Sequence, residues 1–298
     1  MGESMAASRK AGAEERRAQI LGQLAGVPSL SPAATQVISL VQDPAVEIED
    51  VQRAIQHDAS LTADILRMAN SSAFGGRATI ASVDQAVIRF GLEWVYRFVL
   101  ASAVGPIASR PVKGYDLGPE ALWWHSVAVA AGTEALSAVL ERESSPRAFT
   151  SGLLHDLGKS ILGSFLEIDA TDLVAMAEAE GIPFDAAERT VLGIDHAEVG
   201  AILLERWNLP EGIVEAVRHH HRPEDREGED PEGTVELVHV ADALCMQTGL
   251  GLGRDGLAYS CSDQVWTRLG VTGDLAEQVI IGIQERVVEL KKFFVPQE

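Results

Sequence analysis

The sequence predicts an all-α protein built from two packed helical lobes. Apolar residues recur at helical spacing along most of the 298 residues, and segments alternating with the period of two typical of strands are absent. Short turns rich in Pro, Gly, Asp and Ser separate the helical segments. Hydrophobic residues make up 46% of the chain and charged residues 23%, which is enough apolar surface for a full core.

The first lobe is expected over residues 19–112, after a polar tail at 1–18 that lacks the apolar centre of a secretory signal. Ser31 followed by Pro32 is typical of an N-cap and a first-turn proline. The first three predicted helices of this lobe begin at Pro32, near Glu47 and after His57-Asp58. The third ends at Asn70-Ser71-Ser72, before Phe74-Gly75-Gly76. Two further helices are expected over 82–90 and 93–104.

The second lobe is expected over residues 113–298, because the segment 111–118 contains Pro111, Gly114 and Gly118 and is the best candidate boundary. The charged run 222–233 reads as an exposed loop, and the glycine-rich run 249–256 as a flexible turn. The predicted helices lie near 119–140, 147–166, 169–180, 184–192, 196–207, 210–221, 234–249, 262–269 and 273–293.

Charge and composition exclude several classes of function. The net charge is −20, and such a surface repels nucleic acid backbones and anionic membranes. The Lys and Arg residues form no basic patch, and no run approaches 18 apolar residues. We therefore expect no polymeric nucleic acid partner and no membrane span. Cys245 and Cys261 form no metal-like pair and indicate a reducing compartment, the cytoplasm.

Among the eight histidines, His196 has the phase of a buried residue. Val199 and Leu203 follow it at i+3 and i+7, on the same side of a helix. Asp195 and Glu198 form an N-cap and N3 pair, so the helix is expected to begin beside His196.

The histidine triple 219–221 is resolved by the same argument. His220 lies seven residues after Ile213 and His221 seven after Val214, both members of an apolar stripe. His219 is out of phase and should face solvent. Two of the three histidines are therefore expected to face the core.

Asp242 lies on an apolar stripe, four residues after Val238 and three before Cys245. A buried aspartate needs a cation, a histidine or several hydrogen-bond donors. One alternative is a local pair with His239, three residues earlier.

The strongest local signal is HDLGK at 155–159. Adjacent His155 and Asp156 offer a neutral nitrogen and a hard oxygen, a mixture that suits Fe, Mn or Zn better than Ca. A divalent metal there would lower the pKa of bound water and polarise a phosphoryl oxygen, and Lys159 would neutralise a phosphate. The alternative is an ordinary His-Asp pair satisfied within the core.

The order of these residues along the chain resembles the metal-binding pattern of the HD phosphohydrolase superfamily, and HDLGK resembles its signature. The first lobe is more specific. GVPSLSPAATQVISLVQDP, HDASLTADILRMANSSAFGG and SVDQAVIRFGLEWVYRFVL closely resemble the amino-terminal region of the HDOD family. The resemblance runs from about Leu24 to Asp242. It implies an all-helical fold in which the second lobe is an HD-like bundle, and a family of signalling proteins that mostly lack demonstrated catalysis.

The resemblance also implies a ligand set. It assigns His125, His155, Asp156 and Asp242 to a first metal and His196, His220 and His221 to a possible second one. Compared with the HD-GYP enzymes that hydrolyse cyclic di-GMP, two features are missing. Arg-Pro-Glu-Asp follows His221 in place of the Gly-Tyr-Pro element, and Ala121 stands where those enzymes have an acidic ligand.

Three functions are compatible with the sequence. The first is a regulatory module with little or no catalysis that acts on signalling proteins in trans. The second is a metal-dependent phosphohydrolase of a nucleotide or cyclic nucleotide. The third is a non-catalytic sensor of a nucleotide or metal. The lost HD-GYP features favour the first, and the nearly complete ligand set supports the second.

Overall fold

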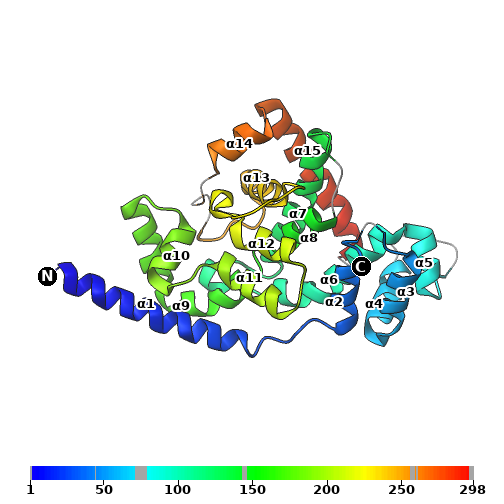
Figure 1. Ribbon diagram of the computed structural model, residues 1–298, viewed down its shortest axis with the longest axis horizontal. Coiled ribbons are helices and arrows are strands. Elements are labelled where there is room, and N and C mark those ends of the chain that lie inside the picture. Colours follow the sequence, from blue (N-terminus) through cyan, green and yellow to red (C-terminus); the bar gives the residue numbers. More distant parts are fainter. Residues whose placement is uncertain are drawn as a thin grey trace.

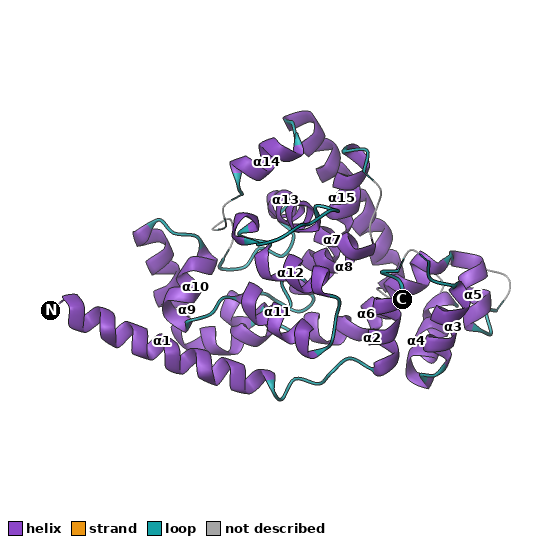
Figure 2. Cartoon of the chain, viewed as in Figure 1, coloured by secondary structure: helices purple, strands orange, loops and turns teal. Residues whose placement is uncertain are grey.

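The computed structural model describes residues 2–43, 45–70, 79–142, 146–255, 259 and 261–294, and this part of the chain is helical (Figure 2). No strand occurs in these ranges, where a single isolated bridge joins Val112 and Leu117. The predicted all-α class is confirmed. The expected turn at Phe74-Gly75-Gly76 lies outside the described residues. None of the described helices is long and apolar enough to cross a bilayer.

The segment expected to be a polar tail is helical. Helix α1 spans Gly2–Leu24 and lies along one edge of the molecule, beside α9 and α10 (Figure 1). Ile20 and Leu24 are buried on its inner face. Arg17 also pairs with Glu198, in the helix that follows α10, at 2.6 Å. The apolar face of α1 has too few apolar residues to be recognised from the sequence, because arginine side chains make part of its contact with the neighbouring helices.

Two helices of the first lobe begin where the capping residues predict them. Ser31 Oγ accepts a hydrogen bond from the amide of Ala34, and Asp58 Oδ1 accepts one from the amide of Leu61. Its helices gather at one end of the molecule in Figure 1. They are α2 (Pro32–Leu40), α3 (Ile48–Gln56), α4 (Ala59–Ala69), α5 (Val83–Phe90) and α6 (Leu92–Ala108).

The second lobe is a helical bundle around α7. Short 3₁₀ helices at Lys113–Tyr115 and Pro223–Asp225 interrupt its connections. Its α-helices are α7 (Ala121–Val139), α8 (Pro146–Leu154), α9 (Lys159–Glu180), α10 (Phe184–Leu192), α11 (His196–Arg206), α12 (Glu211–His219), α13 (Thr234–Gln247), α14 (Asp263–Leu269) and α15 (Gly273–Phe294).

One helix boundary differs from the prediction in a way that matters for the site. The expected helix 147–166 is broken, because α8 ends at Leu154 and α9 begins at Lys159 and runs to Glu180. Between them, the amide of Lys159 donates to the carbonyl of Asp156 in a tight turn. Neighbouring side chains on an α-helix diverge by about 100°. The turn avoids this divergence and leads both His155 and Asp156 toward one interior point.

Two apolar cores meet beside this turn. The larger core runs from α1 through the first lobe to α12 and includes Leu154 and Leu157, which flank the turn. The smaller core joins α7, α13, α14 and α15 and includes Val238 and Cys245, which flank Asp242. The larger core is continuous across residues 112 and 113, so the two lobes are packed tightly together. The position of the boundary between them stays a prediction.

Gly158 fixes the approach of α9 to α11. A Cβ atom at this position would lie 1.9 Å from the carbonyl oxygen of His196 and 2.7 Å from the amide nitrogen of Gly200, both rigid backbone atoms. We expect Gly158→Ala to lower the free energy of unfolding by about 3 kcal/mol, the upper range for overpacking. Urea denaturation measures this change.

Gly105→Ala is the matched control, because no atom lies within 4 Å of its added Cβ and the residue is inside helix α6. This control should stabilise the protein by up to about 1 kcal/mol through helix propensity. Equal unfolding midpoints for the two variants would contradict the proposed packing constraint.

Candidate metal centre

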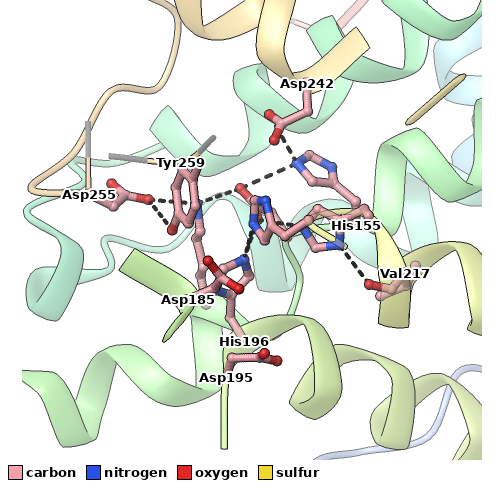
Figure 3. A network of polar contacts seen from close by, with 12 residues as sticks. His155, Asp185, Asp195, His196, Val217, Asp242, Asp255 and Tyr259 are labelled. Carbon is pink, nitrogen blue, oxygen red and sulfur yellow. Dashed lines mark hydrogen bonds and ion pairs between the residues drawn. The ribbon is translucent and has the colours of Figure 1, made fainter. Parts of the chain in front are cut away.

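The seven residues singled out from the sequence lie together in the structure, although they come from separate elements. Figure 3 labels three of them, His155, His196 and Asp242. Their nitrogen and oxygen atoms form two sets, each with all members within 4.8 Å of one another. We call them the Asp242 group (His125, His155 and Asp242) and the His196 group (Asp156, His196, His220 and His221).

Asp156 stands between the two groups. Its Oδ2 atom lies 3.5 Å from His125 Nε2 and 3.4 Å from His155 Nε2. Its Oδ1 atom faces the other way, 3.3 Å from His196 Nε2 and 3.8 Å from His220 Nε2. One carboxylate therefore presents an oxygen to each group, which is the arrangement that a bridging ligand requires.

The tautomers of four histidines follow from their Nδ1 partners. Each Nδ1 atom lies within hydrogen-bond distance of an oxygen: Leu250 O at 3.1 Å from His125, Gly152 O at 2.8 Å from His155, Val217 O at 2.6 Å from His220, and Glu188 Oε2 at 2.7 Å from His196. Carbonyl and carboxylate oxygens accept, so Nδ1 carries the proton. In the neutral ring, the Nε2 lone pair is then left to face the centre, as in metal-binding histidines.

Several of the inward-facing atoms make no regular hydrogen bond and face one another only as ion-pair contacts of 3.1 to 3.8 Å. A buried unpaired polar atom is costly, and a bound ion or an ordered water is one way in which native structures satisfy it. The unpaired buried atoms at the centre are His125 Nε2, His155 Nε2, His220 Nε2, Asp156 Oδ1 and Asp242 Oδ1. Imidazole nitrogens mixed with carboxylate oxygens suit Zn, Fe or Mn. The residues present therefore fit a divalent metal.

The electrostatics of the centre favour positive charge near the carboxylates. Burial disfavours the charged form of His155, but the carboxylates of Asp156 and Asp242 outweigh it and raise its pKa to about 10. Burial, reinforced by the neighbouring imidazoles of His155 and His196, lowers the pKa of His220 to about 3. At neutral pH, His155 therefore favours the protonated form, whereas His220 favours the neutral form.

Glu188 on α10 belongs to the site but was not identified from the sequence. It is fully buried, and its Oε2 accepts from Nδ1 of His196 at 2.7 Å and from the His196 amide at 3.0 Å. The hydroxyl of Tyr115 donates to its other oxygen. Glu188 lies four residues from both Phe184 and Leu192 on a buried stripe, which is the same signal that singled out Asp242.

The run 249–256 is more than a turn, although Gly256 lies outside the described residues. It brings Asp255 to the Lys159 side chain, with Asp255 Oδ2 2.7 Å from Nζ. Nζ also lies 2.8 Å from Asp156 Oδ2. The ring of Tyr259 stacks on His221, with ring centroids 4.2 Å apart and planes at 6°. Figure 3 shows Asp255 and Tyr259 together on one side of the centre. Nothing in the loop's sequence periodicity signals this contact.

The local pair between His239 and Asp242 does not form. His239 Nδ1 donates to the carbonyl of His220 at 2.6 Å, and its Nε2 accepts from the amide of Ser262 at 2.9 Å. His219 is partly exposed beside Glu215, at 3.5 Å, as its helical phase predicts. Asp242 instead faces His125 and His155.

Comparison with known proteins agrees with this architecture. The model of the HDOD domain matches residues 27–223. A Treponema pallidum protein of uncharacterised role is 27% identical over 213 residues, which are 68% of this chain and 39% of that protein. Ribonuclease Y of Thermus thermophilus is 33% identical over 122 residues, 40% of this chain. The chain thus spans 39% and 15% of the length of these relatives.

Solved structures share the fold over nearly the whole chain. An HDOD domain protein of unknown function from Geobacter sulfurreducens superposes with a TM-score of 0.66 at 24% identity, covering 95% of this chain and 99% of that one. A candidate phosphohydrolase from Shewanella amazonensis has a TM-score of 0.62 at 25% identity, with 91% and 97% covered. A candidate signal transduction protein from Marinobacter aquaeolei has a TM-score of 0.70 at 21% identity, with 96% and 64% covered. With its helical lobes, its HDLGK turn and the match over residues 27–223, this chain belongs to the HDOD family.

Proposed function

We propose that this protein is a regulatory HDOD module that holds divalent metal in its interior and acts through a signalling partner in trans, with little or no catalysis. In this proposal, the two His/Asp groups are ligand sets, and Asp156 is shared between them. Metal in the centre fixes the relative positions of α7, α11, α12 and α13, and the surface set by those helices is what a partner protein binds.

One observation carries the proposal, namely the burial of the converged side chains. His125, His155, Asp156, His196, His220 and Asp242 are each at most 4% exposed. Lys159, the side chain best suited to hold a phosphate, is 2% exposed and already paired with two carboxylates. An arrangement that is rich in ligands but closed to solvent supports metal retention over turnover. The net charge of −20 supports a protein or small-molecule partner over polymeric nucleic acid.

A metal-dependent phosphohydrolase is the second candidate, favoured by the position of Asp156 between the two groups. Divalent metal at such a centre would lower the pKa of bound water and polarise a phosphoryl oxygen. Two similar proteins carry enzyme names, a candidate phosphohydrolase and Ribonuclease Y. For this chain the substrate would be a small nucleotide, because of the acidic surface.

Metal analysis followed by an activity panel separates the two functions. In protein purified without chelator, we expect about one divalent ion for each of the two groups. Nucleotides and cyclic dinucleotides should be turned over no faster by this protein than by its Asp156→Ala variant. Turnover that disappears in that variant would establish the phosphohydrolase instead, and protein purified without metal would refute the proposed centre.

A further inference from the structure

Lys159 is an unusual residue to find in an interior, because its ammonium is buried among charged and aromatic groups. Its Nζ contacts Asp156 Oδ2 and Asp255 Oδ2 at 2.8 and 2.7 Å. It also lies 5.5 Å from the ring centroid of Tyr115 and 4.9 Å from that of Tyr259. Asp156 belongs to the candidate metal centre, so Asp255 is the carboxylate that pairs with Lys159 from outside the seven-residue set.

The loop that carries Asp255 is held in place by backbone contacts. The amide of Arg254 donates to the carbonyl oxygen of Tyr115 at 2.7 Å. A Cβ atom on Gly253 would lie 2.2 Å from that same oxygen, so glycine is required for the approach. Five residues before Asp255, the carbonyl of Leu250 accepts from His125. The loop is therefore fitted against both Lys159 and a histidine of the Asp242 group.

We propose that Asp255 is a built-in occupant of the anion subsite beside the Lys159 ammonium, and that the phosphate group of a small phosphorylated ligand must displace it in order to bind there. This inference rests on the proposed metal-binding function. The Asp255 carboxylate holds one oxygen where a phosphate oxygen would bind, and it is buried to 2% exposure, as a substitute ligand must be.

Phosphate is the ligand class that the subsite favours over a carboxylate. A phosphate monoester brings close to two negative charges and three acceptor oxygens, whereas Asp255 brings one charge. One phosphate oxygen would satisfy Lys159 while the others face the metal-binding groups. Tyr259 completes the wall, because its hydroxyl donates to Asp255 Oδ2 at 2.9 Å and its ring covers His221. The hydroxyl remains available to a phosphate oxygen once Asp255 leaves.

Calorimetric titration with inorganic phosphate tests the proposal on full-length protein as purified. Asp255→Asn keeps the size of the side chain but removes its charge, so phosphate should bind about tenfold more tightly than to the wild type, because the internal competitor is weakened. Adding Lys159→Met to this variant should abolish the gain. Asp263→Asn, an exposed substitution with the same change in charge, should leave the affinity unchanged.

Metal content measured on the same samples separates this inference from the proposed function. Wild-type protein without metal would refute the metal centre. Intact metal content with equal phosphate affinity in wild type and Asp255→Asn would refute only the role of Asp255. Tight phosphate binding that persists in the double variant would place the anion elsewhere.

Hydrogen exchange on the wild-type protein gives a second test that needs no variant. Saturating phosphate should speed exchange of the Arg254 amide several-fold, because displacement of Asp255 loosens the bond to Tyr115. Unchanged exchange at saturation would mean that phosphate binds without displacing the loop, and would overturn the proposal.

Discussion

Asp156→Asn is expected to abolish tight metal binding at both groups, whereas Asp242→Asn should weaken binding only at the Asp242 group. Asp156 presents one oxygen to the histidines of each group, at 3.3 to 3.8 Å. Asp242 Oδ1 faces only His125 and His155, at 3.1 and 3.7 Å. Loss of a direct ligand should lower affinity by more than the tenfold to about a hundredfold typical of outer-shell partners.

Metal stoichiometry and competition with a chelator measure these effects separately at the two groups. Asp185→Asn is a suitable control, since Asp185 is also buried but pairs with Arg189, at 2.8 Å, outside both groups. The control should retain full metal content. If Asp156→Asn lost only half of the bound metal, Asp156 would serve one group and the shared-ligand geometry would be wrong.

Glu188→Ala should weaken the His196 group by about tenfold to a hundredfold while leaving the Asp242 group intact. Glu188 fixes the proton of His196 on Nδ1 and so keeps the Nε2 lone pair directed at the centre. The substitution also removes the acceptor of the buried Tyr115 hydroxyl. An unsatisfied buried group costs about 1–3 kcal/mol, so the unfolding midpoint should fall as well.

A conservative variant distinguishes a role of Glu188 in positioning His196 from a general loss of protein stability. Glu188→Gln keeps an acceptor oxygen and should restore most of the metal affinity, although it removes the charge. Glu178→Ala on the exposed face of α9 is the surface control and should behave as wild type. If Glu188→Ala lowered stability but left both affinities unchanged, Glu188 would be a structural residue with no influence on the centre.

The sequence predicted the inward-facing histidines because helical phase is a local property. His196, His220 and Asp242 each stand on an apolar stripe, and each is buried at the centre. The same reasoning applied to Glu188 would have identified it. The fold class was equally accessible, since capping residues such as Ser31 and Asp58 act within one turn of their helices.

What the sequence could not predict depends on contacts between distant segments. The break at 155–158 brings Gly158 against the backbone at His196, a contact with no trace in the local pattern. Asp255 reaches Lys159 across a long sequence separation from an aperiodic loop. Helix α1 was missed because its buried residues are few and its polar residues find partners on other helices.

A metal ion at the centre would act as a cross-link, because its candidate ligands come from helices far apart in the chain. His125 is on α7 and Asp242 on α13, far apart in the chain, and the described cysteines, Cys245 and Cys261, are both free. Metal shared by these side chains would tie together helices that no disulfide joins. It would bind the folded state alone, so that its affinity adds directly to the free energy of unfolding. The centre would then fill only after the last of these helices has docked, which makes metal uptake a measure of completed folding.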